Sequence, residues 1–233
     1  MVPLRAEDTE STAAQRSFDR AKQEHEQHPE DPETTWRFAR ASFDLADTAT
    51  KNSDRAEIAQ QGIAVCSQAL AKTPNSGPLH YYLALNKGQL ARTKSLGALK
   101  LVDQMEAEFT KAIALDPSFD YAGPDRSLGL LYRDAPALAS IGDRNKARQH
   151  LRRALELAPE YPGNRLSLIE SALKWGDRKD ALQELKLLEN SWESARAKFI
   201  GPAWASSWTD WEARLEKVRK ALGESARNES PRH

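Results

Sequence analysis

Side chains that commonly take part in catalysis or metal binding are few in this sequence, and they are scattered. Its 233 residues include five histidines and one cysteine. His25 and His28 share one helix face and could hold a metal weakly, but no further ligand near them completes a coordination set. Cys66 lies among apolar residues, without the adjacent histidine or helix start that would stabilise a thiolate, so we expect a buried thiol.

Motifs of common catalytic and cofactor-binding sites are also missing. The sequence contains no P-loop, no paired glycine-rich dinucleotide turn, no HExxH and no CxxC. An enzyme would need a site assembled from distant residues, and no residue stands out for that role. We therefore predict a non-catalytic protein with no catalytic residues, no metal and no cofactor.

Composition and charge restrict the class of partner. Acidic and basic residues are equal in number, 34 of each, so there is no overall positive charge for binding nucleic acid. No stretch approaches the roughly 18 apolar residues of a membrane span. The first residues lack the basic-then-apolar plan of a signal peptide. The protein is therefore expected to be cytoplasmic as written, or periplasmic if an N-terminal leader was removed, and the sequence does not separate the two cases.

An internal repeat indicates how the chain folds. Gly142 and Gly176 lie 34 residues apart, and Ala147 and Ala181 keep the same offset. This is the period of the tetratricopeptide repeat (TPR), in which two helices form a hairpin. Prolines that cannot continue a helix follow three of the expected second helices, at Pro74, Pro117 and Pro159. Since one hairpin cannot bury its own apolar face, successive hairpins must stack.

The predicted fold class is all-α, a TPR-like helical-hairpin solenoid with about four hairpins plus N-terminal and C-terminal capping helices. The repeats are expected over residues 32–190, as helices 32–48 with 54–72, 78–93 with 99–115, 124–133 with 144–157, and 164–175 with 178–190. Residues 1–31 are expected to hold an N-terminal helix and a flexible start. A tryptophan-rich loop and capping helix follow at 191–223, and a disordered tail at 224–233. The tryptophans could instead form an oligomer interface.

Two features of the repeats point to candidate binding residues. The connections at 93–97 and 134–141 are longer than the repeat requires, which marks a binding face or merely lengthens the hairpins. First helices line the concave groove of a TPR array, so Tyr82 and Asn86 are expected to point into it. Such a polar groove suits a peptide or a small polar ligand.

A second group of candidates is expected at the junction of the third and fourth repeats. In this predicted polar cluster, Arg126 and Arg165 would supply charge-assisted donors and Glu170 an acceptor, with Tyr132 and Asn164 beside them. The alternative is that Arg126 and Glu170 simply bridge neighbouring repeats.

Part of the chain resembles a particular bacterial family. The runs FTKAIALDP (109–117), YAGPDRSLGLLY (121–132) and APEYPGNRL (158–166) look like TRAP-transporter T-component proteins. The resemblance implies an accessory protein of the cell envelope, often a lipoprotein, that oligomerises and partners a substrate-binding protein. The sequence departs from that family in having no lipobox cysteine.

These observations favour a non-catalytic protein–protein interaction scaffold. The resemblance narrows it to an accessory subunit of a TRAP-type transport system, with a solute-binding protein as its partner. A protein or peptide partner is expected, with no nucleic acid and no membrane span, and a homo-oligomer remains open. The alternative function is a small-ligand carrier that uses a cavity in the concave groove.

Overall fold

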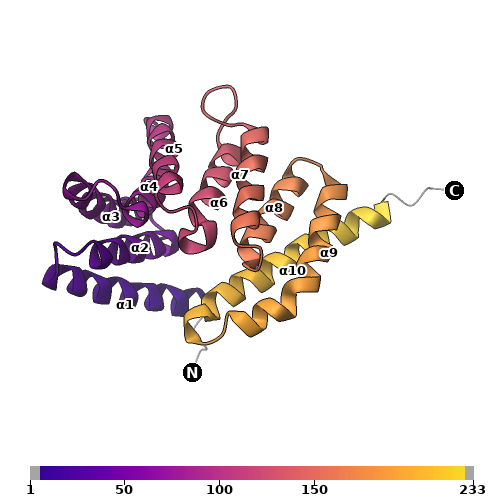
Figure 1. The fold of residues 1–233 in the computed structure, drawn as a ribbon, viewed down its shortest axis with the longest axis horizontal. Helices are drawn as coiled ribbons and strands as arrows, with labels where there is room; N and C mark the ends of the chain where they lie inside the picture. Colours follow the sequence, from indigo (N-terminus) through magenta and orange to yellow (C-terminus); the bar gives the residue numbers. More distant parts are fainter. Residues whose placement is uncertain (1–5, 229–233) are drawn as a thin grey trace. The chain divides into compact units, whose positions relative to one another are not determined.

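The computed structural model describes residues 6–228 and the side chains of residues 12–223. Within this part the chain is helical and contains no strand, which confirms the predicted all-α class. The helices are α1 (Ala6–Gln27), α2 (Pro32–Thr48), α3 (Asn52–Lys72), α4 (Gly77–Ala91), α5 (Ala98–Leu115), α6 (Phe119–Asp134), α7 (Arg144–Leu157), α8 (Pro162–Lys174), α9 (Arg178–Lys198), the 3-10 helix η1 (Pro202–Trp204) and α10 (Ala205–Asn228). Figure 1 shows their order along the chain.

The observed helices follow the predicted hairpins closely, with two notable differences. Helix α9 continues to Lys198, so Trp192 lies in a helix rather than in a loop. Helix α10 continues to Asn228, into the predicted tail, of which residues 229–233 lie outside the described residues. The predicted flexible start includes residues 1–5, which also lie outside them. No helix of the described part is long and apolar enough to cross a membrane.

The chain divides into two compact units. Unit 1 comprises residues 1–119 and 135–142, and unit 2 comprises residues 120–134 and 143–233. Helices α1 to α5 belong to unit 1, and α7 to α10 belong to unit 2 together with nearly all of α6.

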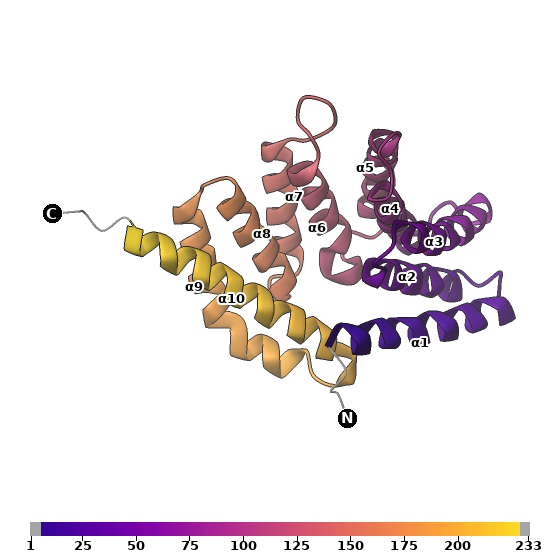
Figure 2. The ribbon, with the colours of Figure 1, turned by 180° about the vertical axis from the view of Figure 1, so that it is seen from behind.

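Unit 1 is a stack of antiparallel helices. Each of α1 to α4 packs against the next helix in the chain, and α2 also packs against α4. Figures 1 and 2 both show α1 beside α2. Phe18 and Phe38 join these two helices with ring centroids 5.3 Å apart. Cys66 is fully buried, as predicted, and burial raises the pKa of its thiol.

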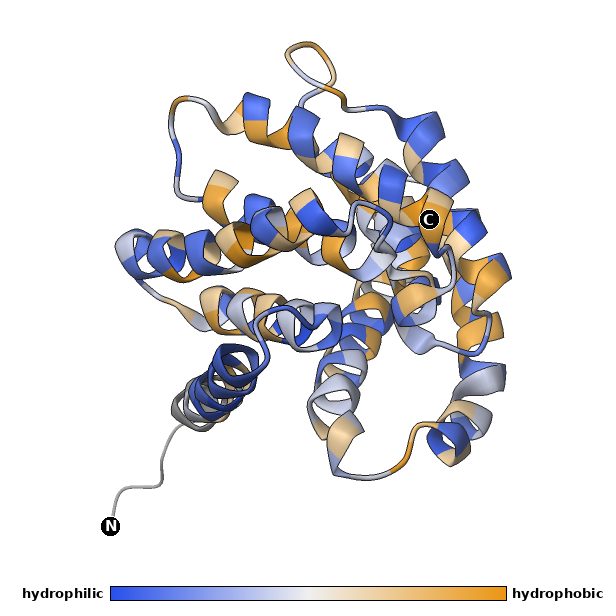
Figure 3. Ribbon diagram, turned by 60° about the vertical axis from the view of Figure 1, so that its left-hand side comes forward, coloured by the Kyte–Doolittle hydropathy of each residue, from blue (hydrophilic) through white to orange (hydrophobic). Residues whose placement is uncertain are grey.

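Unit 2 has its core between α8, α9 and α10. Leu166 and Ile169 of α8 are fully buried with Leu188 of α9, and α10 adds Trp211 and Leu215. Figure 3 shows hydrophobic and hydrophilic residues interspersed along the helices of the chain, as expected when each helix buries only part of its surface.

Helix starts are fixed by local side chains. Asp31 accepts a hydrogen bond from the Glu33 amide, and Pro32 occupies the first position of α2. Asp143 accepts from two amides at the start of α7. These caps satisfy amides that have no partner inside the helix. The sequence therefore sets these helix boundaries locally.

Candidate functional site

The predicted polar cluster of unit 2 does not form as one group. Arg126 and Asn164 come together, with Arg126 Nη1 donating to Asn164 Oδ1 at 2.8 Å. Arg165 instead pairs with Glu184 of α9. The prediction assigned these residues to one junction but had no information on which way each side chain points around its helix.

The remaining two predicted residues of that group have other partners. Glu170 accepts two hydrogen bonds from Arg214 of α10, at 2.7 and 2.9 Å. The Tyr132 ring stacks on His150 with centroids 5.6 Å apart. Arg126 and Glu170 therefore link neighbouring helices, which agrees with the alternative that they bridge repeats. A binding role for these residues stays a prediction.

Arg126 and Asn164 hold an unusual backbone turn. Asp120, Tyr121 and Ala122 have φ of 50°, 55° and 59°, so α6 begins with three residues in the left-handed region and is right-handed after them. This conformation costs roughly 1–2 kcal/mol per residue. Arg126 donates to the Tyr121 carbonyl at 3.2 Å, and the Asn164 amide donates to the same oxygen at 3.1 Å. The two side chains thus stabilise a turn that the sequence does not favour locally.

Tyr82 and Asn86 lie inside the helix packing of unit 1 rather than along an open groove. Tyr82 is 3% exposed and stacks on Trp36 with centroids 5.7 Å apart. Asn86 is fully buried, and its amide donates to the carbonyls of Ala39 and Tyr82 at 2.8 Å. A Cβ on Gly62 would lie 2.6 Å from the Asn86 side chain, so α3 and α4 approach closely here. The structure thus places both side chains in helix packing, and a binding role for them stays a prediction.

A large hollow in unit 1 lies elsewhere, between second helices of successive hairpins. Helices α3 and α5 both pack against α4 but not against each other. The groove between them, here called the α3–α5 groove, has a volume of about 600 Å³. Its lining residues are Ser67, Leu70, Pro74, Asn75, His80, Leu83, Lys87, Glu108, Lys111, Ala114 and Leu115.

Charged side chains occupy the centre of the α3–α5 groove. His80 and Lys87 are two turns apart on α4, and both are nearly buried, as is Glu108 of α5. Glu108 Oε2 lies 2.5 Å from His80 Nδ1, and Oε1 lies 3.5 Å from Lys87 Nζ. Lys111, one turn further along α5, lies 3.6 Å from the same carboxylate and is 56% exposed.

The neighbours of Glu108 determine its charge. His80 Nε2 is 2.9 Å from the Pro74 carbonyl, which can only accept, and His80 Nδ1 faces Glu108. Burial raises the pKa of Glu108, but its hydrogen bond to His80 and the charges of Lys87 and Lys111 outweigh burial and lower that pKa overall. Glu108 is therefore ionised at neutral pH and acts only as an acceptor toward its neighbours.

Sequence reasoning missed this group. The spacing of His80 and Lys87 places them on one face of α4, and Glu108 and Lys111 share a face of α5. Nothing in the sequence pairs the two faces. The prediction placed binding on first helices alone, whereas α5 is a second helix.

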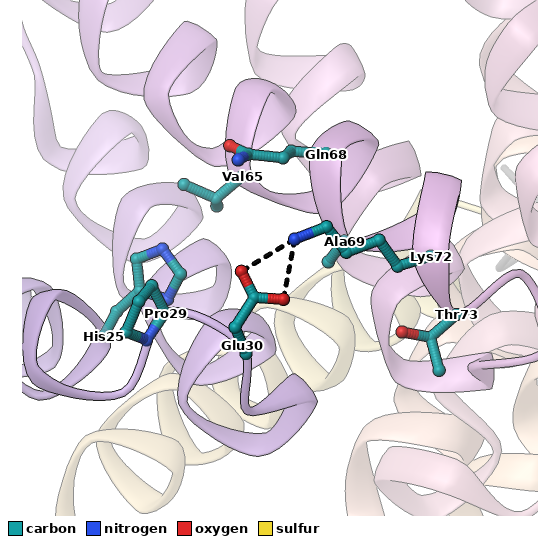
Figure 4. Close-up of a pocket in the computed structure, with 8 residues that line it drawn as sticks. All are labelled: His25, Pro29, Glu30, Val65, Gln68, Ala69, Lys72 and Thr73. Carbon is teal, nitrogen blue, oxygen red and sulfur yellow. Dashed lines mark hydrogen bonds and ion pairs between the residues drawn. The ribbon is translucent and has the colours of Figure 1, made fainter.

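A smaller hollow of about 80 Å³ lies between the end of α1 and α3 (Figure 4). Glu30 and Lys72 form an ion pair of 2.7 Å across it. His25 lines this hollow, and its Nδ1 is 3.3 Å from Thr35 Oγ1. Burial lowers the pKa of His25. No group of three or more side chains suited to binding a metal occurs among the described residues.

Unit 2 has a counterpart of the α3–α5 groove between α7 and α9. It measures about 80 Å³, and Leu168 and Ala172 of α8 line it. Arg148 of α7 forms an ion pair with Asp177, which precedes α9, and lies 4.0 Å from Asp180. This α7–α9 hollow is therefore bridged by charges, unlike the groove of unit 1.

Comparison with known proteins identifies the family. The sequence model of the family described as regulator of microtubule dynamics protein 1-3 matches residues 4–122. The chain belongs to this family. The matched segment contains α1 to α5 and hence the whole α3–α5 groove. The match gives no support to the resemblance to TRAP-transporter T-component proteins, and no curated protein sequence matches the chain.

Solved structures confirm the TPR-like fold of this family member. The thermophilic TPR protein TTC0263 of Thermus thermophilus is 19% identical, with a TM-score of 0.64 over 91% of this chain and 98% of that one. The crystal structure of MamA is 16% identical, with a TM-score of 0.52 over 83% of this chain and 98% of that one. At such identities the similarity shows the fold alone. Proteins of this fold typically present binding surfaces.

Proposed function

We propose that this chain is a non-catalytic protein-binding module and that the α3–α5 groove receives the partner. The observation that carries the proposal is an open groove of about 600 Å³ inside the segment that defines the family. This volume is comparable to that of small-ligand pockets, roughly 300–1,000 Å³, so the groove has room for several side chains of a partner.

The walls of the groove suit contact with another protein. Leu70 of α3 and Leu83 of α4 face it, and Leu115 at the end of α5 is 41% exposed. Apolar side chains beside a few charged groups provide both affinity and orientation, since apolar burial drives association and the charges fix the register. The groove thus has the chemistry of a docking site for a partner segment.

Polymerised tubulin is the first partner to test, because the family description names microtubule dynamics. We expect the chain to sediment with stabilised microtubules. Leu115→Glu should weaken this binding, since it places a charge on the apolar wall. The matched control is Leu96→Glu, because Leu96 is 88% exposed in the connection after α4 and does not line the groove.

The control sets the outcome that overturns the proposal. Equal sedimentation of the Leu115→Glu and Leu96→Glu variants, both with wild-type helicity by circular dichroism, would place the binding surface elsewhere. Failure of the wild-type chain to sediment would remove tubulin as the partner.

The volume of the groove also supports a second candidate, a small-ligand carrier. A ligand enclosed there would raise the melting temperature in proportion to its occupancy. Tyr82 and Asn86 would not contribute, since both are buried in helix packing. The finer hypothesis of an accessory subunit that partners a TRAP solute-binding protein has no observation in its favour.

A further inference from the structure

The α3–α5 groove holds more positive than negative charge. Its centre has one carboxylate, Glu108, against the ammonium groups of Lys87 and Lys111. Since Glu108 can balance only one of these cations, the groove attracts anionic groups.

The two lysines retain capacity for a further acceptor. Glu108 makes its short contact with His80, whereas Lys87 and Lys111 lie at 3.5 and 3.6 Å from the carboxylate. These distances exceed the usual range of a charge-assisted hydrogen bond, about 2.7–2.9 Å. Each ammonium group has three donors, so a second carboxylate could approach without displacing Glu108.

Because Lys87 is nearly buried, a further hydrogen-bond acceptor beside it would be stabilising. The Lys87 side chain is only 12% exposed, and its ion pair with Glu108 is long. A nearly buried ammonium with donors to spare is poorly compensated for its lost hydration. A carboxylate from a partner would supply that compensation, and Lys111, at the more exposed edge, would meet it first.

Apolar side chains flank these cations on both sides. Leu70 lies on the α3 wall, and Ala114 and Leu115 follow Lys111 on the α5 wall. An occupant therefore needs carboxylates and apolar side chains interleaved along a short segment.

We infer that the α3–α5 groove binds an acidic peptide segment in which carboxylates and apolar side chains are interleaved at helical spacing. This inference rests on the proposed protein-binding function and names the chemistry of the partner. The carboxylates contact Lys111 and Lys87, and the apolar side chains contact Leu70, Leu83 and Leu115.

The probe is a fluorescein-labelled peptide of glutamate and leucine, about 14 residues long so that it forms roughly four helical turns. Its counterpart has glutamine for every glutamate. Fluorescence anisotropy should show the acidic peptide binding the full chain about tenfold more tightly or better, since one charge-assisted hydrogen bond contributes about 1.5–3 kcal/mol. The difference should shrink as salt is added.

Variants locate the site. Lys111→Gln should weaken binding of the acidic peptide about fivefold to tenfold and leave the glutamine peptide unaffected. Lys87→Gln should weaken binding of the acidic peptide by at least as much. If Lys87→Gln lowers the helicity of the chain, the test rests on Lys111→Gln alone. The matched control is Lys94→Gln, which removes an exposed lysine outside the groove and should leave both affinities unchanged.

The outcomes separate this inference from the proposed function. Equal affinity for the acidic and glutamine peptides, with loss of both on Leu115→Glu, would overturn the acidic preference and leave a protein-binding groove. Absence of binding to either peptide, or binding only to vesicles that contain phosphatidylserine, would also overturn the inference. Sedimentation with microtubules tests the proposed function independently.

Discussion

The α3–α5 groove of unit 1 and the α7–α9 hollow of unit 2 are built from corresponding helices, yet their volumes are about 600 and 80 Å³. Prolines follow α3 and α7 at the same distance, at Pro74 and Pro159. Eleven residues before these prolines, α3 has Ile63 and α7 has Arg148. Arg148 reaches the aspartates at the start of α9, and Ile63 cannot form such a bridge.

The comparison shows that the repeat determines where the helices lie but not which side chains fill the space between them. In unit 2 the charges pair across the hollow. In unit 1 the side chains of His80, Lys87 and Glu108 gather along α4 and α5, and the α3 residues that line the groove, Ser67 and Leu70, carry no charge. A few side chains on one helix therefore affect how much open space remains between two second helices.

Each unit contains one of two fully buried asparagines, and replacing the one in unit 2 should have the largest effect on stability. Asn164→Ala should lower the free energy of unfolding by about 3 kcal/mol or more, because it removes the four hydrogen bonds that the Asn164 side chain makes in a largely buried network. The Asn164 amide lies within 3.1 Å of the carbonyls of Tyr121, Ala154 and Ala158, and its oxygen accepts from Arg126.

The matched variant in unit 1 is Asn86→Ala. Asn86 donates to only two carbonyls, and its side-chain oxygen has no hydrogen-bond partner. We expect a smaller loss, about 1–2 kcal/mol. Urea unfolding followed by circular dichroism measures both variants, and a larger loss for Asn86→Ala would reverse this ranking of the two units.

The next effect tests the charged centre of the groove. Glu108→Gln should lower the free energy of unfolding by about 1–2 kcal/mol at neutral pH, because it weakens the contact with His80 and removes the charge that Lys87 faces. Thermal unfolding measures the loss. A more stable variant would show that the buried charges are retained for binding rather than for stability.

The pH dependence of the same variant sharpens this test. The pKa of Glu108 is lowered in the folded chain, so its ionised form stabilises the fold above the pKa of the unfolded state. That stabilisation is lost as the pH falls through the folded-state pKa. The advantage of wild type over Glu108→Gln should therefore be full near neutral pH, begin to fall near the ordinary pKa of glutamate, about 4.3, and be lost below the folded-state pKa. A constant difference in melting temperature would contradict this account.

The smallest effect concerns the ion pairs of unit 2. The hydrogen bond from Arg144 is the main cause that lowers the pKa of Asp177, and Arg148 adds to it. Arg144→Gln should raise the pKa of Asp177 toward its ordinary value, as measured by NMR titration of its side-chain carboxyl. The melting temperature should change less than in the variants above, because exposed ion pairs contribute little. An unchanged pKa would show that the pair does not persist in solution.

The sequence allowed the architecture to be predicted but not the site. The 34-residue spacing of Gly142 and Gly176, with the terminating prolines, places nearly every helix within a few residues. Backbone preferences and helix caps act locally, so a single sequence reveals them. Side-chain partners depend on how each helix is rotated about its axis, which the repeat does not specify.

Particular residues show where sequence reasoning ends. Arg165 follows Asn164 in the chain, yet it pairs with Glu184 while Asn164 pairs with Arg126. Adjacent helical residues point about 100° apart, so assigning both to one cluster was a geometric error. The contact between His80 and Glu108 joins residues of two helices, and no local pattern predicts it.

The left-handed turn at the start of α6 has a consequence for the order of folding. Asp120, Tyr121 and Ala122 have a local contact through Arg126, but the Asn164 contact that also stabilises the turn joins residues more than 40 positions apart. We expect the turn to become fully stable only after α8 has docked. A fragment ending at residue 122, where the family match ends, would contain these three residues but lack Arg126 and Asn164. We expect the last three residues of that fragment to lose their left-handed backbone conformation. A fragment meant to preserve the turn must therefore extend through α8.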